Sequence, residues 1–213
     1  MFGVEDFNDL DAAWQRALSQ AWRAHVLGNI GVGAVLTDPT GFIVGEGRNR
    51  VVDTSAPPGR LHGNYLAHAE IDVLAQLPPG DYERHTIWTT LEPCLLCVSA
   101  IVTSHVGVVR FAAPDPLWRG LEELRGINAQ ADKRWPERIG PMTGPMAAFS
   151  SVLPMVWFFR NQGGGAAVSA YESDYAGLVE LARKLARERT LDALGGQTVE
   201  AVLERLWPDL VGL

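Results

Sequence analysis

The chain has 213 residues, of which 47% are hydrophobic and 20% are charged, and its formal net charge at pH 7 is −7. This composition predicts a globular protein with a sizeable hydrophobic core, and the acidic balance disfavours a long nucleic-acid footprint. The two cysteines, Cys94 and Cys97, are too few for a disulfide framework. The first ten residues carry no signal-peptide pattern, and the most apolar run, 146–159, is too short to span a bilayer. We therefore expect a cytoplasmic protein with no membrane partner.

The first 115 residues alternate between helical and strand-like patterns. Apolar residues at helical spacing or helix-forming composition mark three segments: 7–27, 66–77 and 94–104. Runs of β-branched and apolar residues mark four strands: 32–38, 42–49, 85–91 and 106–113. This order predicts a sheet with helices on its faces. The last two strands are expected to be parallel, because a helix joins them.

Beyond residue 115 the pattern is mostly helical. Helices are predicted over four segments: 117–125, 142–161, 171–191 and 198–207. The glycine-rich stretch 161–169 is typical of a hinge or loop between helices. We expect a sheet-containing domain over residues 1–140 and a helical C-terminal extension over 141–213 that packs on the same domain.

Two short motifs carry the chemistry, His-Ala-Glu at 68–70 and Pro-Cys-Leu-Leu-Cys at 93–97. A catalytic zinc site takes three protein ligands and leaves one position for water, and His68, Cys94 and Cys97 are suitable ligands. Glu70 lies two residues from His68, so its carboxylate can move protons beside the metal. A buried apolar pair or a redox pair would also explain the cysteines, but neither explains the upstream His-Ala-Glu.

The same motifs resemble a known family. His-Ala-Glu followed by Pro-Cys-x-x-Cys is the signature of zinc nucleobase deaminases, and "VGAVLTD", "TLEPCLLCVSAIVTS" and "VGVVRFAAPD" strengthen the likeness. Over residues 10–116 the chain resembles the cytidine/deoxycytidylate deaminase superfamily, in the branch of guanine, cytosine and tRNA adenosine deaminases. The resemblance implies a Zn²⁺ cofactor, a homodimer, and a three-layer α/β/α sandwich on a mixed five-stranded sheet, to which the pattern beyond residue 115 adds a helical C-terminal extension.

The resemblance also implies roles for individual residues. His68, Cys94 and Cys97 match the zinc ligands, and Glu70 matches the catalytic proton shuttle. Asn49 matches an asparagine that contacts the base or its sugar. Three further candidates for substrate contact come from their position near the motifs: Asp115, His62 and Tyr65. A turn or helix-capping role is the alternative for Asp115.

These features predict a hydrolase that acts on C–N bonds in cyclic amidines. Its substrate would be a small free nucleobase or nucleoside in purine or pyrimidine metabolism, with ammonia as a product. A guanine- or guanosine-type purine is favoured, and cytosine- and adenine-type substrates stay open. The first alternative is a tRNA adenosine deaminase, although segment 116–138, with five basic and four acidic residues, offers a polynucleotide little to hold. The second alternative is a non-catalytic zinc-stabilised partner module, against which the intact Glu70 argues.

Overall fold

A computed structural model describes residues 7–213 of the protein. Residues 1–6 of the predicted domain 1–140 lie outside the described part, as does most of the N-terminal stretch that lacks a signal-peptide pattern. The strands are β1 Gly33–Thr37, β2 Ile43–Arg48, β3 Thr86–Leu91, β4 Val108–Ala113 and β5 Glu137–Ile139. The α-helices are α1 Ala12–Val26, α2 Ala69–Leu74, α3 Leu95–Ser104, α4 Ala129–Lys133, α5 Pro145–Gln162, α6 Gly165–Glu172, α7 Ala176–Glu188 and α8 Val199–Leu210.

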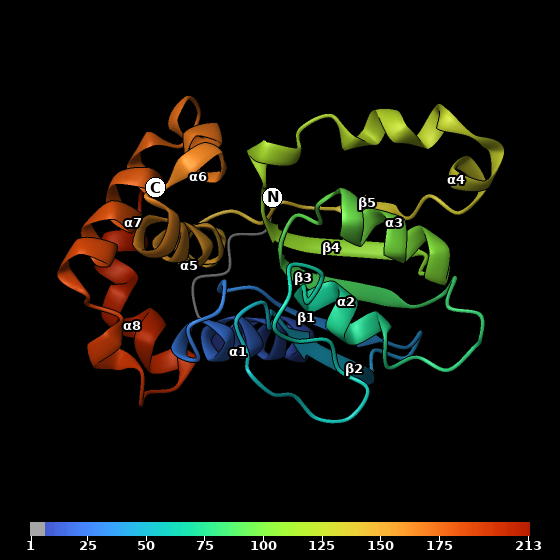
Figure 1. Ribbon diagram of the computed structural model, residues 1–213, viewed down its shortest axis with the longest axis horizontal. Coiled ribbons are helices and arrows are strands. Elements are labelled where there is room, and N and C mark those ends of the chain that lie inside the picture. The colour runs from blue at the N-terminus through green and yellow to red at the C-terminus, as the bar shows by residue number, and fades with distance from the viewer. Residues whose placement is uncertain (1–6) are drawn as a thin grey trace.

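The five strands form one mixed sheet in the order β2-β1-β3-β4-β5. β1 runs antiparallel to β2 and β3, whereas β3, β4 and β5 are parallel. α1 and α5 pack on one face of the sheet, and α2 and α3 pack on the other (Figure 1). The predicted fold class is confirmed, as is the parallel pairing of the strands on either side of α3.

Two glycines let helices approach the sheet closely. A Cβ on Gly33 would lie 2.2 Å from the carbonyl oxygen of Ala17 in α1. A Cβ on Gly47 would lie 2.6 Å from the carbonyl oxygen of Ala69, at the start of α2. Real side chains do not tolerate such distances, so glycine is required at both positions. The second contact matters for the site, because it holds the N-terminus of α2 against the end of β2.

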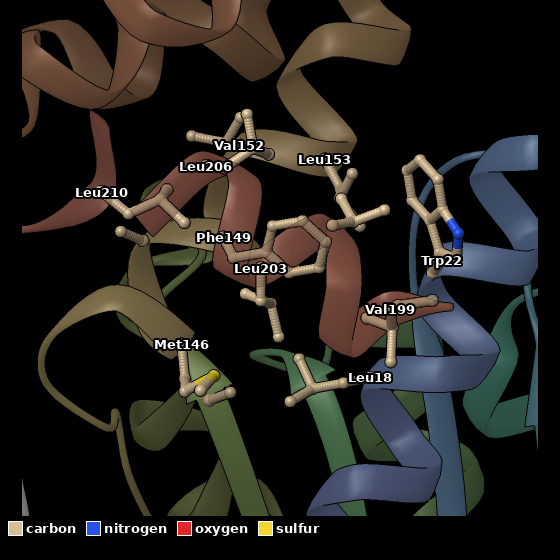
Figure 2. Close-up of a cluster of buried hydrophobic side chains, with 14 of the residues drawn as sticks. Leu18, Trp22, Met146, Phe149, Val152, Leu153, Val199, Leu203, Leu206 and Leu210 are labelled. Carbon is tan, nitrogen blue, oxygen red and sulfur yellow. The ribbon is translucent and has the colours of Figure 1, made fainter. Parts of the chain in front are cut away.

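The C-terminal helices share one hydrophobic core with α1. Helices α5 to α8, coloured orange to red, gather at one end of the molecule beside α1 (Figure 1). Figure 2 shows how Leu18 and Trp22 of α1 meet Phe149 and Leu153 of α5 and Leu203 of α8. Burial of such side chains stabilises a fold by roughly 1.5–3 kcal/mol each. The extension therefore packs on the sheet-containing part through a continuous core.

Several predicted elements differ from the structure. The stretch 161–169, predicted as a loop, contains the first half of α6, whose Val168 is buried in the core. Gly163, Gly164 and Gly165 all have positive φ, so the chain turns there and re-enters a helix at once. The single helix predicted over 171–191 is divided between α6 and α7.

The segment after β4 also differs from its prediction. A helix was predicted over 117–125, but the chain forms two 3-10 helices, Pro116–Trp118 and Leu121–Ile127, separated by Gly120 with φ of 89°. No helix between residues 7 and 213 has both the length and the hydropathy needed to cross a membrane.

Candidate functional site

The N-termini of α2 and α3 bring the two motifs together. His68 immediately precedes α2, and Cys94 immediately precedes α3. Cys97 lies in the first turn of α3 and is 1% exposed. Each helix therefore directs its positive end towards the same point, which favours thiolate and carboxylate groups there. The local sequence is compatible with the start of α3 at this point. Pro93 lies just before the helix, where proline is tolerated.

The three candidate ligands have the spacing that a tetrahedral zinc ion needs. The Nδ1 atom of His68 lies 3.5 Å from the Cys94 sulfur and 3.4 Å from the Cys97 sulfur, and the two sulfurs are 3.7 Å apart. Bonds of about 2.0–2.3 Å in tetrahedral geometry place ligand atoms about 3.3–3.8 Å apart. Three such donors fit zinc in type and in position, and they leave one coordination position for a non-protein ligand.

The electrostatics of the site favour the thiolate form of Cys94 and the thiol form of Cys97. A hydrogen bond from the Cys97 thiol, with a further contribution from His68, lowers the pKa of Cys94 to about 4, although burial opposes this change. The same hydrogen bond, together with burial, raises the pKa of Cys97 well above its usual value. Cys94 is thus a thiolate at neutral pH, and thiolate is the metal-binding form of cysteine.

Glu70 is buried next to the ligands. It is 3% exposed, and its Oε2 atom lies 3.3 Å from the Cys97 sulfur. The hydroxyl of Thr89 in β3 donates a hydrogen bond of 2.9 Å to Oε1. Burial raises the pKa of Glu70, and the negative charge of the Cys94 thiolate raises it further. A carboxyl group with a raised pKa can both accept and release a proton near neutral pH.

The site opens into a cavity of about 230 Å³. One wall carries the polar groups of the two motifs, including His68, Glu70 and Cys94. A second part of the lining, which we call the apolar wall, comes from the C-terminal helices. It consists of Pro154, Met155 and Phe158 of α5 with Ala167 and Tyr171 of α6. A small enclosed cavity with few polar groups at one side is typical of small-molecule sites.

Two of the predicted substrate contacts line this cavity. Asn49 follows β2, and its Oδ1 atom accepts a hydrogen bond of 3.2 Å from the backbone N–H of Val51. Asp115 follows β4, and burial raises its pKa to about 7 although the N–H of Leu117 opposes this. The hydrogen bond from Leu117 is 3.2 Å long and caps a 3-10 helix, so the capping alternative for Asp115 is present as well.

His62 and Tyr65 do not reach the cavity among its described lining residues. Both lie on the exposed loop between β2 and α2, and Tyr65 is 77% exposed. The backbone of the loop folds back at Gly63, whose N–H donates to the carbonyl of Arg50 at 3.0 Å. This turn leaves the side chains of residues 61–66 in solvent.

The sequence led us to expect the loop 50–64 and the C-terminal helices to close a pocket around a small substrate, but it did not predict which residues of these helices form the apolar wall. Met155 and Tyr171 belong to helices whose apolar residues are typical of any core, and nothing in their spacing marks a cavity. Tyr171 is 4% exposed, and its hydroxyl donates a hydrogen bond of 2.7 Å to the carbonyl of Pro114. That bond attaches α6 next to Asp115. A buried tyrosine needs such a partner, but the sequence does not say which partner it finds.

Comparisons with known proteins match the part of the chain that holds the motifs. A family model of the cytidine and deoxycytidylate deaminase zinc-binding region matches residues 8–113. A tRNA-specific adenosine deaminase of Haemophilus influenzae is 39% identical over 103 residues, which cover 46% of this chain and 55% of that protein. A tRNA-specific adenosine deaminase of Aquifex aeolicus is 33% identical over 111 residues, which cover 52% of this chain and 70% of that protein.

A solved structure shares the fold. The structure of NE0047 in complex with 2,6-diaminopurine has a TM-score of 0.50 and 22% sequence identity, and the match covers 71% of this chain and 84% of that chain. This similarity supports the architecture alone. The chain spans about half the length of the Haemophilus relative, 55%, and the family model ends before α5 begins.

Proposed function

The chain belongs to the cytidine and deoxycytidylate deaminase zinc-binding family, and on that premise we propose that it hydrolyses an exocyclic amino group of a nucleobase. One observation carries the proposal. His68, Cys94 and Cys97 converge at tetrahedral spacing, with the buried carboxyl of Glu70 beside them, at one wall of a cavity. Zinc is the cofactor, and when bound it would lower the pKa of a coordinated water and so supply a nucleophile.

The residues of the site would have different roles in this reaction. His68, Cys94 and Cys97 would hold the metal. Glu70 would take a proton from water and deliver it to the ring nitrogen, and it would then carry a second proton, from the hydroxyl formed on the ring carbon, to the amino group that leaves as ammonia. The hydrogen bond from Thr89 would keep the Glu70 carboxyl in place. The Asn49 side chain, with its oxygen occupied by Val51, would offer its N–H groups to an acceptor on the substrate.

Adenosine in tRNA is the first candidate substrate. Two relatives that each match about half of the chain are named tRNA-specific adenosine deaminases. These names favour tRNA over the small free base that the sequence analysis preferred, and they argue against the expectation of no nucleic-acid partner. The Haemophilus match covers only part of either protein, so this substrate is proposed on the shared half of the chain.

A free base or nucleoside is the second candidate, because of the apolar wall. Met155, Phe158 and Ala167 line the same cavity as the candidate metal ligands, and all three belong to helices beyond the matched residues 8–113. Such a wall excludes water and would bury most of a small ring. A nucleotide within a folded RNA must instead be extruded from its stack to enter a pocket.

Ammonia release distinguishes these candidates. Zinc-loaded protein would be incubated separately with guanine, guanosine, cytosine, adenine, adenosine and unmodified tRNA. Inosine formation in tRNA, with binding that weakens steeply as salt rises, would support the first candidate. Turnover of a free base without tRNA binding would support the second. Stoichiometric zinc with no turnover of any substrate would favour the non-catalytic partner module instead.

A homodimer is proposed from the resemblance to the family. Exposed apolar side chains near the start of α2 and α3, Leu66 at 56% and Leu95 at 41%, would suit such an interface. Light scattering on the purified protein should give a mass of about twice 23.2 kDa. A monomer at micromolar concentration would contradict this proposal. Residence in the cytoplasm and a place in purine or pyrimidine metabolism stay predictions.

A further inference from the structure

A group of ion pairs surrounds the backbone on both sides of Asn49 in the sequence. We call it the Asp72 network, and it consists of Arg48, Arg50, Asp53, Arg60 and Asp72. The side chain of Asp72 is 0% exposed, that of Arg48 is 4% exposed and that of Asp53 is 9% exposed. None of these side chains lines the cavity among the described residues. The proposed chemistry therefore gives the network no direct role.

Asp72 holds the chain on both sides of Asn49. Its Oδ2 atom accepts a hydrogen bond of 3.1 Å from the backbone N–H of Arg48. The same oxygen accepts one of 3.0 Å from Nε of Arg50. Asn49 sits between these two donors, so its backbone position depends on the Asp72 carboxylate.

Arg48 adds a second restraint on Asn49. Its Nη1 atom donates a hydrogen bond of 2.9 Å to the carbonyl oxygen of Asn49, and its guanidinium forms a two-point pair with Asp53. Asp53 is fixed in turn by the side-chain amide of Asn29, at 2.6 Å. Two-point arginine–carboxylate pairs fix orientation as well as distance.

Arg60 connects the exposed loop to this network. Its Nη1 atom lies 2.9 Å from Oδ2 of Asp72 and donates a hydrogen bond of 3.0 Å to the carbonyl oxygen of Glu46. The side chain is 19% exposed, whereas residues 61–66 that follow it are exposed. Arg60 is thus the point at which the loop between β2 and α2 reaches the interior.

Asp72 also belongs to the helix that carries the catalytic groups. It lies two residues after Glu70, and its backbone N–H donates to the carbonyl of His68 at 2.9 Å. The network therefore joins the residue that faces the substrate, Asn49, to the helix of the metal ligand and the proton shuttle. The backbone N–H of Asn49 itself donates to the carbonyl oxygen of Val32, in the segment before β1.

Stability alone is a weak explanation for five charged groups that are buried or half-buried. Replacing a buried ion pair by apolar side chains of similar volume is often neutral or stabilising, because of the desolvation cost of charged groups. Hydrogen-bonded ion pairs do fix geometry, and misplacement of a reacting group by about 1 Å can cost on the order of 100-fold in rate. Geometry is the property that this network supplies.

We infer that Asp72 and Arg60 are positioning residues that set the place of the Asn49 amide relative to Glu70 and the metal ligands. The inference rests on the proposed function for its kinetic consequence. Its structural content, the dependence of the Asn49 side chain on Asp72 and Arg60, can be measured without any turnover.

The first measurement uses the NMR signal of the Asn49 side-chain amide in full-length zinc-loaded protein. The signal is assigned by its loss in Asn49→Ala. We expect Asp72→Asn and Arg60→Gln to shift or broaden it, and Arg60→Lys to restore it in part, since an ammonium can still bridge Asp72 and Glu46. Arg60→Gln changes a partly exposed side chain, so it folds even if Asp72→Asn does not. An unchanged signal in Arg60→Gln would overturn the inference.

Asp192→Asn is the matched control for these variants. The Asp192 carboxylate is also shared by two arginines, with hydrogen bonds of 2.6 Å from Nη1 of Arg160 and 2.6 Å from Nε of Arg189. It lies in the C-terminal extension, outside the described lining of the cavity. We expect this variant to leave the Asn49 signal unchanged. A similar change in the control would mean that the signal reports general destabilisation, and the inference would fail.

The second measurement is a double-mutant cycle on ammonia release. We expect Arg60→Gln to lower kcat/KM by about 10- to 100-fold, mostly through kcat, with zinc content unchanged. In the Asn49→Ala background the same change should have little further effect, because coupled residues are not additive. Full additivity would overturn the inference. If the unmodified protein releases no ammonia, the proposed function fails, and the Asn49 signal still decides the positioning role.

Discussion

The two walls of the cavity differ in chemistry and in origin. The polar wall comes from two short motifs, and its His68, Glu70 and Cys94 stand at or next to the starts of α2 and α3. The apolar wall comes from Met155 of α5 and Tyr171 of α6, far along the chain. In the proposed function the first wall would supply the groups that react, and the second would supply shape. The reaction type is thus carried by local sequence, whereas the fit of the substrate depends on long-range packing.

Loss of a metal ligand should have the largest effect, since it removes the function of the polar wall. We expect Cys97→Ser to lose bound zinc and all deamination, because a serine hydroxyl is a poor zinc ligand. Its unfolding temperature should fall to that of chelator-treated protein, since zinc binds only the folded state. Metal analysis and calorimetry measure both effects. Ser99→Ala on the exposed face of α3 is the control. Full zinc content in Cys97→Ser would contradict the assignment.

Glu70→Gln should separate metal binding from proton transfer. We expect the variant to keep its zinc and to lose about 10²- to 10⁴-fold in kcat, because an amide cannot carry the proton. The free energy of unfolding of the variant at pH 7 should not be lower than that of the unmodified protein. Burial raises the pKa of Glu70, so its ionised form is disfavoured in the folded state, and a neutral amide of the same shape removes that penalty. Full activity in the variant would exclude Glu70 as the shuttle.

The difference between the walls explains what the sequence could predict. The positions of His68 and Cys97 follow from helix starts and ligand chemistry, which depend on residues within one turn. The mixed sheet follows from alternation of strands and helices. β5 is only three residues long, Glu137–Ile139, and no hydrophobic pattern marks it. Its parallel pairing with β4 is a tertiary contact, which a propensity argument cannot see.

The loop before α2 shows that prediction from sequence is limited in the same way for individual side chains. His62 and Tyr65 are near His68 in sequence, but the direction of their side chains depends on a distant contact. Arg60 reaches Asp72 and the carbonyl of Glu46, and the residues after it turn outward. Proximity in sequence therefore predicted the neighbourhood correctly, but it did not predict which side chains enter the cavity.

The apolar wall can be tested by filling the cavity. Ala167 of α6 is half-buried and lines the cavity. We expect Ala167→Leu to raise KM about 10-fold or more, with little change in kcat, since a few methylene groups in a pocket are worth about 1–3 kcal/mol. Ala166→Leu, on the exposed neighbour, is the matched control. Equal kinetics in the two variants would show that α6 does not contact the substrate.

Asp115 should make stability fall as pH rises. Burial raises its pKa in the folded state to about 7, from a usual value of 3.8. Between these values the unfolded chain is ionised while the folded chain keeps its proton, so folding becomes less favourable with rising pH and then levels off above about 7. Asp115→Asn should therefore show a flatter profile between pH 4 and 7. Urea unfolding of zinc-loaded protein measures both curves, and parallel curves would contradict the prediction.

Tyr171→Phe should have the smallest effect, and it tests how the two walls are joined. The lost hydroxyl donates to the carbonyl of Pro114, which would be left without that bond, at a cost of about 1 kcal/mol. Tyr175→Phe is the control, since that ring lies 5.8 Å away and makes no such bond to Pro114. Urea titration should show a loss for Tyr171→Phe alone. KM should also rise, by at most about fivefold, because a displacement of α6 moves the wall beside Asp115 and about 1 kcal/mol corresponds to a factor of about five. Equal stability in both variants would show that packing of the ring, rather than the hydroxyl, attaches α6 to the sheet-containing part.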